Sequence, residues 1–298
     1  MRSLGRRGFT LPELLVGLVL FSIVGLAIYK VFLSSERLYQ QQTQRVDLQQ
    51  NLRAATNVLP AELRQLDADE GDILAMASDS IKIRAMRELA FICTAPTLGG
   101  SQPLTGITMV VRGSGPGDSL FFGSRNFNVS TDSLLVYYEG STSARTDDTW
   151  LPAKLTAIAA QNCPNGAAGQ RLTFNIPTLS GLQSNVNGNI TVGSPVWGYE
   201  YNVVYRSFQT GGQWYVGVRN SNGIQPVIGP LNGSGGLVFS YYDSAGTVTA
   251  VPANVAQIKI QLTLQTAQTV TGLSSPNPID SITTWVTLRN NLRRAVGS

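Results

Sequence analysis

The stretch MRSLGRRGFTLPELLVGLVLFSIVGLAIYKVFL, residues 1–33, contains the strongest structural signal of this 298-residue chain. Its first eight residues carry three arginines, and an apolar segment then runs from Phe9 to Leu33, broken only by Glu13 and Lys30 among charged residues. As a helix, the 21 residues from Phe9 to Tyr29 would span about 31 Å. That length is enough to cross the hydrocarbon core of a bilayer. The segment therefore predicts a membrane-spanning helix.

Flanking charge and the acid within the helix separate the possible kinds of membrane segment. The leader arginines predict that the amino-terminal side stays in the cytoplasm and that the bulk of the chain is exported. A secretory signal peptide has small residues after its apolar core, but Ala27 is followed here by Ile28 and Tyr29. A plain anchor does not explain Glu13, because an acid inside a membrane helix costs about 2.5–3.5 kcal/mol. Glu13 therefore needs a partner.

The string Gly8-Phe9-Thr10-Leu11-Pro12-Glu13 resembles the processing site of type IV prepilins and type II secretion pseudopilins. The resemblance implies that a prepilin peptidase cuts after Gly8 and that the new amino terminus, on Phe9, is methylated. Glu13 is then the fifth residue of the mature chain. In that family, this acid is held to pair with the amino terminus of a neighbouring subunit.

The composition fits an exported domain and offers little attraction for nucleic acid. Only 13% of the residues are charged, and glycine accounts for 30 of 298. The formal net charge is +4, but three positive charges belong to the leader. Without residues 1–8 the charge falls to +1. A net charge this small favours neither nucleic acid nor an acidic surface as a partner.

Cysteine and histidine usage limits the chemistry of the exported region. Cys93 and Cys163 are the only cysteines, and a single pair in an oxidising compartment is most simply one disulfide. They are not spaced as a C-x-x-C motif, so redox catalysis is not expected. The chain has no histidine, which removes histidine-activated nucleophiles and histidine-ligated metal sites. We expect no catalytic residue, no metal site and no cofactor.

A second helical pattern follows the apolar segment directly. Apolar residues recur at intervals of three or four from Leu48 to Leu66, which predicts one face of an amphipathic helix. Pro60 should kink or restart this helix, because proline lacks an amide donor. We expect a leader at 1–8, a transmembrane helix half at 9–33, an amphipathic half at 34–66 and a β-rich exported domain at 67–298.

Alternating apolar and polar residues predict strands after residue 67, most clearly at Gln257–Leu264. Gly211-Gly212 and Asp243–Gly246 predict turns. The exported part could hold two β subdomains, with the region 139–170 as the weakest seam. The other strands are expected at 81–85, 106–112, 119–122, 133–138, 171–176, 199–208, 213–219, 237–242 and 281–289.

Most of the chain, not only its start, resembles the minor pilin PilW and the related J-type pseudopilin of type II secretion. The resemblance rests on Leu237–Asp243, on the strand Val255–Leu264 and on the closing segment Ser281–Asn290. It implies the α+β pilin fold, with a long amino-terminal helix packed on an enlarged antiparallel β domain of one or two sheets. The membrane helix lacks the central proline of many major pilins, and Pro12 instead precedes Glu13.

The leading functional expectation is a non-enzymatic minor subunit that initiates or caps a type IV pilus or pseudopilus. Its partners would be prepilin peptidase, other minor and major pilins and the inner membrane, with the carboxyl-terminal domain outside the cytoplasm. It could serve a pilus, a secretion pseudopilus or a DNA-uptake apparatus.

Two alternatives stay open. The first is a binding role in adhesion or DNA uptake, in which aromatic and basic residues in surface loops would contact nucleic acid, although aromatics in a β core are the simpler interpretation. Scattered acids could serve a hydrolase or hold calcium, although they form no recognisable pair or ligand pattern. The first set is Trp150, Trp197, Trp214, Tyr215, Arg145, Arg206 and Arg219, and the second is Asp132, Glu139, Asp147 and Asp148.

Overall fold

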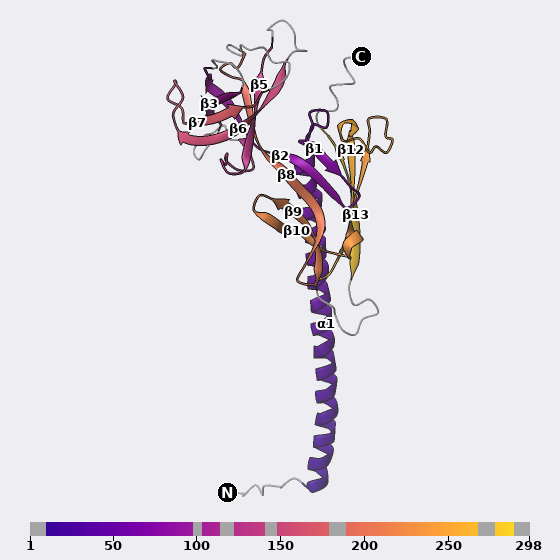
Figure 1. The fold of residues 1–298 in the computed structure, drawn as a ribbon. Helices are drawn as coiled ribbons and strands as arrows, with labels where there is room; N and C mark the ends of the chain where they lie inside the picture. Colours follow the sequence, from indigo (N-terminus) through magenta and orange to yellow (C-terminus); the bar gives the residue numbers. More distant parts are fainter. Residues whose placement is uncertain are drawn as a thin grey trace, which may run out of the picture.

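A single helix, α1 (Leu11–Leu63), forms a stalk that carries a β-rich head in the computed structural model of the chain (Figure 1). Its 53 residues correspond to a rod of about 80 Å. The structure describes residues 10–97, 103–113, 122–140, 148–178, 189–267 and 278–288. The amino-terminal end of the helix points away from the head, as Figure 1 shows.

Local sequence explains where α1 begins and ends. Thr10 precedes the helix in an extended conformation, and Pro12 lies in the first turn, where a missing amide costs no hydrogen bond. The expected restart at Pro60 does not occur, because α1 continues to Leu63. Pro60 lies one turn from the end, so its missing donor removes a single bond near the end of the helix.

The second half of α1 packs on the head through the face that the sequence predicts. Leu48, Leu52, Ala55, Leu59 and Leu63 are all buried, with exposed fractions of 7% or less. The structure confirms the amphipathic periodicity of this half. One polar contact accompanies the apolar ones, since the Asn51 side-chain amide donates to the Gly229 carbonyl.

The upper lobe of the head is a closed antiparallel barrel. Each of its six strands pairs with two neighbours, in the order β2, β3, β7, β6, β5, β8 and back to β2. Closure leaves no free edge between these strands. Their bounds are β2 (Ser80–Thr94), β3 (Leu104–Arg112), β5 (Asp132–Tyr138), β6 (Thr149–Ala160), β7 (Gln170–Ile176) and β8 (Pro195–Thr210).

The lower lobe surrounds the upper end of α1. The first half of β2 and the second half of β8 continue into it and pair with β1 and β9. The β11–β12–β13 sheet closes the other side, and the Tyr241 hydroxyl donates to backbone carbonyls of the β1–β2 turn. The remaining bounds are β1 (Ile73–Met76), β4 (Phe122–Gly123), β9 (Gln213–Asn220), β10 (Gly223–Leu231), β11 (Leu237–Tyr242), β12 (Gln257–Gln265) and β13 (Ile279–Thr287).

Two separate hydrophobic cores lie under this one continuous sheet. The barrel core contains Phe174 and Leu134, whereas the lower core contains Leu59, Leu63 and Ile260. The boundary between the cores crosses β2 and β8, which run through both lobes. It does not lie at 139–170, because that region contains β6, a central strand of the barrel.

The structure confirms most of the strands expected from alternation and adds three others. β12 buries Ile258, Ile260, Leu262 and Leu264, and Gly211 and Gly212 form the β8–β9 turn with positive φ. Of the expected 119–122 strand, only Phe122 is described, in β4. β1, β6 and β10 were not expected. β6 and β10 contain prolines, which argue against a strand, and register shifts accompany both strands.

Candidate functional site

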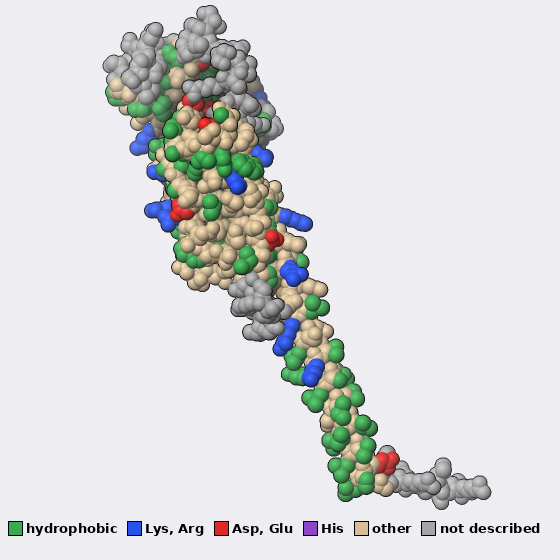
Figure 2. All heavy atoms as spheres, turned by 90° about the vertical axis from the view of Figure 1, so that its right-hand side faces the viewer, with side chains coloured by type: hydrophobic (Ala, Val, Ile, Leu, Met, Phe, Trp, Pro, Cys, Tyr) green, Lys and Arg blue, Asp and Glu red, His purple; other side chains and the backbone are tan. Residues whose placement is uncertain are grey.

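The first half of α1 extends away from the head, as Figure 1 shows. Every residue from Thr10 to Gln40 is exposed, including the large apolar side chains of this segment. Figure 2 shows hydrophobic side chains covering the far half of the stalk. Among the described residues, α1 is the one helix long and apolar enough to cross a membrane. An apolar surface of this size requires lipid or other protein around it.

Glu13 lies in the first turn of this apolar helix. It is the only ionisable residue between Thr10 and Tyr29. A carboxylate is favourable near a helix amino terminus, where backbone N–H groups point outward. No described basic side chain forms an ion pair with it. Gly8 and Phe9, the expected processing residues, lie outside the described residues.

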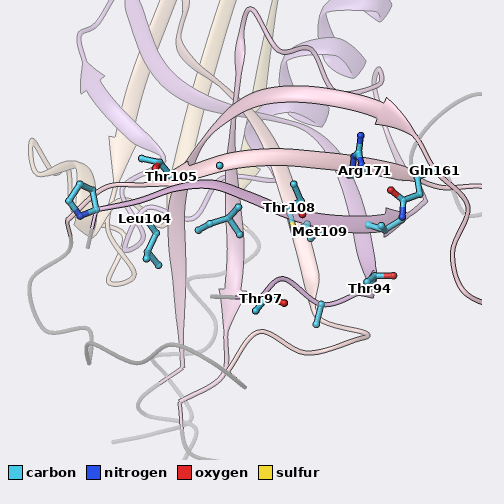
Figure 3. A pocket seen from close by; sticks show the side chains of 13 residues that line it. Thr94, Thr97, Leu104, Thr105, Thr108, Met109, Gln161 and Arg171 are labelled. Atoms are coloured by element: carbon cyan, nitrogen blue, oxygen red, sulfur yellow. The ribbon is translucent and has the colours of Figure 1, made fainter. Parts of the chain in front are cut away.

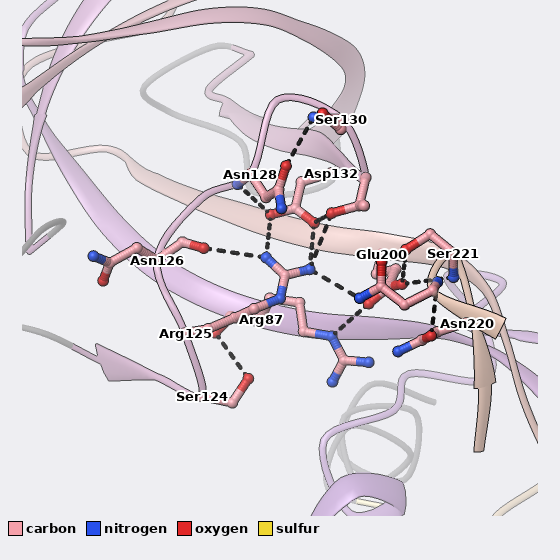
Figure 4. Close-up of polar contacts among 12 residues, drawn as sticks. Arg87, Ser124, Arg125, Asn126, Asn128, Ser130, Asp132, Glu200, Asn220 and Ser221 are labelled. Atoms are coloured by element: carbon pink, nitrogen blue, oxygen red, sulfur yellow. Dashed lines mark hydrogen bonds and ion pairs between the residues drawn. The ribbon is translucent and has the colours of Figure 1, made fainter. Parts of the chain in front are cut away.

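A largely buried network of charged side chains connects the stalk to both lobes, and Figure 4 shows its part from Arg87 through Glu200 to Arg125 and Asp132. Arg87 on β2 pairs with Glu62 on α1 at 2.6 Å and with Glu200 on β8 at 3.2 Å. Arg125 binds Asp132 with both terminal nitrogens, each at 2.6 Å, and also reaches Glu200. Glu200 therefore accepts from two guanidinium groups and joins the two halves of the network.

The environment of Glu200 favours its charged form. Burial alone would raise the pKa of this carboxyl, but hydrogen bonds from Ser221 and the charge of Arg87 outweigh burial. Its pKa therefore lies below the ordinary glutamate value. The neighbouring carboxylates raise the pKa of Arg125, chiefly through its hydrogen bond to Asp132. Glu200 and Arg125 thus remain ionised at neutral pH.

No pattern in the sequence predicts this network. β2 shifts register against β8 between Met86 and Glu88, and an irregularity of this kind redirects the side chain at Arg87. The partners of Arg87 come from positions 25 and 113 residues away. No local pattern links such distant charges, so the folded chain was needed to find the network.

Cys93 and Cys163 form a disulfide in the upper lobe, with their Cα atoms 5.7 Å apart. Cys93 lies near the end of β2, and Cys163 follows β6. The bond thereby connects two barrel strands that are not neighbours in the ring. Its role is structural, because both sulfur atoms are bonded and neither is free to act as a nucleophile.

The aromatic residues expected in surface loops belong to strands instead. Trp150 lies on β6, Trp197 on β8, and Trp214 and Tyr215 on β9. Trp214 packs against the lower core. Of the arginines named with them, Arg206 and Arg219 lie on β8 and β9, whereas Arg145 lies outside the described residues. The loop location was wrong, because all four rings are carried by strands of the sheet.

The scattered acids do not converge on one point. Asp132 is neutralised by Arg125, and Asp148 accepts from the Tyr137 hydroxyl and the Gly140 amide. Glu139 ends the segment after β5, and Asp147 is not among the described residues. Within the described part of the chain, no three cysteine or acidic side chains are grouped to hold a metal ion.

One pocket of about 520 Å³ lies along β3 beside the disulfide-bearing end of β2 (Figure 3). Four threonines and several apolar residues line it, and Gln161 and Arg171 lie at one end. Arg171 is its only charged residue. Among the described residues that line the pocket there is no acid and no thiol. Its threonine, glutamine and arginine side chains can form hydrogen bonds with a ligand.

Comparison with known proteins gives one match. Residues 4–29 match the family model described as the prokaryotic N-terminal methylation motif. No curated protein and no solved structure matches the chain. The matched residues include the last five residues of the leader, which end in Gly8, and Phe9 and Glu13. They also include most of the exposed apolar half of α1.

Proposed function

We propose that the chain is a minor, non-enzymatic member of the type IV pilin and pseudopilin family that initiates or caps a filament, because its residues 4–29 match the N-terminal methylation motif. Membership in this family implies processing by prepilin peptidase and assembly with other pilins. Cleavage would then fall after Gly8, and the new amino terminus on Phe9 would be methylated. The mature chain would then begin three residues before Pro12.

The observation that carries this proposal is the exposed apolar half of α1. The segment from Leu11 to Leu33 contacts no other part of the described chain, although it is almost wholly apolar. Before assembly, the inner membrane would cover this surface, since a helix of 23 residues spans about 34 Å. After extraction, the corresponding helices of neighbouring subunits would cover it.

Glu13 would provide the polar contact that selects the assembled state. In a filament core of low dielectric, an unpaired carboxylate or an unpaired amino terminus is costly, and the two together are favoured over either alone. The amino terminus of a neighbouring subunit supplies the missing charge. This accounts for an acid within an otherwise apolar helix.

The size of the head supports a minor rather than a major subunit. Its two lobes, with separate cores, occupy the chain from residue 67 onward. A head of this size on every subunit would crowd a close-packed shaft, whereas one subunit at the tip meets no such limit. The resemblance of residues 237–290 to PilW and the J-type pseudopilin supports the same role.

The proposal is tested by Glu13→Ala in cells that assemble the filament. We expect normal removal of the leader, read by mass spectrometry of the mature amino terminus, and loss of the subunit from sheared filaments. Glu36→Ala is the matched control, because Glu36 is exposed on the same helix outside the apolar half. Full incorporation of Glu13→Ala would overturn the assembly role of this acid.

A further inference from the structure

A second pocket, of about 450 Å³, lies between the loop that follows α1 and the outer face of the barrel. One wall is apolar and aromatic, and the other is acidic. The pocket is far from the exposed membrane half of α1, at the opposite end of the stalk. Neither filament assembly nor the processing motif uses it.

The apolar wall is formed by Leu135, Trp197, Trp150 and Met86. Leu135 lies between Leu134 and Val136, which point into the barrel core, so its own side chain points outward. It is nevertheless only 4% exposed. Trp197 lies directly opposite it on β8. An outward-facing leucine beside two tryptophans makes this part of the barrel surface a preformed apolar wall.

The ring of Trp150 is held in place by its neighbour. Its centroid lies 5.3 Å from that of Tyr137, with the two rings edge to face. Tyr137 is fixed in turn by donating its hydroxyl to Asp148 at 2.7 Å. The indole can therefore present a flat face to a ligand without losing further conformational freedom.

The acidic wall carries more negative than positive charge. Asp67, Glu70 and Asp72 line the pocket, and Arg84 is the only basic residue among its lining residues. The Arg84 guanidinium is occupied by Asp72 and by the Glu70 carbonyl, and it lies 5.2 Å from the centre of the Tyr199 ring. Asp67 and Glu70 form no ion pair within the described residues.

The negative charge of this wall affects the ionisation of Glu70. Burial, followed by the negative charge of Asp67, raises the pKa of the Glu70 carboxyl above its ordinary value. A positive ligand group would relieve this repulsion, whereas an anion would increase it. A neutral apolar ligand would bury the carboxylates further without compensation.

We propose that this pocket binds an ammonium or guanidinium group carried on an aliphatic stem, as in a lysine or arginine side chain or a small diamine. The head group lies against Asp67 and Glu70, and the stem lies along Leu135 and Met86. The faces of Trp150 and Trp197 add attraction for the cation. This inference is independent of the proposed function.

Titration of the full-length protein in a non-ionic detergent tests the proposal through tryptophan fluorescence. The probes are 1,5-diaminopentane and a capped Ala-Lys-Ala peptide, and the same peptide with an acetylated lysine is the uncharged control. We expect saturable binding of at least one charged probe and a loss of at least about tenfold in affinity on acetylation. Binding of the diamine alone would identify small amines as the ligand class, and binding of the peptide alone would identify a polypeptide side chain.

Two pairs of variants separate the pocket from other surfaces. Glu70→Gln should weaken binding about tenfold, whereas Asp79→Asn, an exposed acid on the β1–β2 turn, should not. Trp150→Leu should weaken binding about fivefold, whereas Trp285→Leu, which removes a half-exposed indole on β13, should not. Absence of saturable binding, equal binding of the acetylated peptide, or equal affinity in Glu70→Gln and Asp79→Asn would overturn the proposal.

Discussion

Arg87 on β2 binds Glu62 on α1, with 2.6 Å between the guanidinium nitrogen Nη1 and the carboxylate oxygen Oε1. Both side chains are largely buried, at 11% and 17% exposure. The same guanidinium also reaches Glu200 on β8. The helix that leads to the membrane is therefore connected by one side chain to the two strands that run through both lobes.

Replacing Arg87 with methionine should lower the free energy of unfolding by about 3 kcal/mol. The change keeps the aliphatic length but leaves Glu62 without its partner and Glu200 with one guanidinium fewer, and breaking a buried pair is costly. Denaturant unfolding of the detergent-solubilised protein measures the effect. Arg64→Met is the control, because Arg64 is exposed at the end of α1 and should change stability by less than about 0.5 kcal/mol. Equal effects of the two variants would contradict a structural role for the Arg87 network.

Glu200→Gln should show a stability loss that depends on pH. The pKa of Glu200 in the folded chain lies below its ordinary value of 4.5, so its charged form contributes stability above that pH. The contribution is lost as the pH falls through the folded pKa. At pH 7 we expect the variant to be less stable by about 2 kcal/mol.

The difference in free energy of unfolding between wild type and Glu200→Gln should become smaller below about pH 4.5, because wild-type Glu200 takes up a proton there. Unfolding curves at pH 7, 5 and 3.5 measure this. Ser221→Ala removes one of the hydrogen bonds that lower the pKa of Glu200. In that background the stability contributed by Glu200 should be lost at a higher pH. A difference that is constant from pH 7 to pH 3.5 would contradict the stated pKa shift.

Removal of the disulfide by Cys93→Ser with Cys163→Ala should destabilise the upper lobe. The bond joins residues 70 positions apart, and closing a loop of that length stabilises by about 4 kcal/mol in the chain-entropy picture. Hydrogen exchange should rise in β6 and β7, which belong to the barrel core, before it rises in β12 of the lower core. Reductant should reproduce the change in the wild type and have no further effect on the double variant. Uniform exchange in all three strands would show that the lobes unfold together.

The adjacent glycines 235 and 236 allow a matched comparison of steric fit. A Cβ added at Gly236 would lie 2.8 Å from the Leu231 Cβ and 2.8 Å from the Thr263 carbonyl oxygen, whereas one added at Gly235 would meet nothing within 4 Å. Gly236→Ala should therefore cost about 2 kcal/mol through overpacking. Gly235→Ala should be neutral or stabilise by a few tenths of a kcal/mol. Thermal or denaturant unfolding distinguishes them, and equal stabilities would contradict the packing described at β12.

Local signals predicted much of the fold. The periodicity of Leu48, Leu52, Ala55 and Leu59 is a property of neighbouring turns, and it identified the packed face of α1 before any contact was known. Alternation identified β12 in the same way. β6 was missed because Pro152 argues against a central strand; in the folded chain Pro152 pairs with Leu135 of β5, and the pairing of β6 with β7 begins only at Lys154.

The sequence alone determined the amino-terminal segment: a basic leader, a glycine before Phe9, an acid four residues after Phe9 and an apolar helix. These features are read within about thirty residues, because length, hydropathy and spacing along a single helix need no information about distant residues. The closed barrel, the division of two cores across β2 and β8, the Arg87–Glu200–Arg125 network and the pocket beside Trp150 were decided by tertiary structure. Each of them brings together residues tens to more than a hundred positions apart, and the pairing of strands that does so depends on the whole sheet rather than on any local pattern.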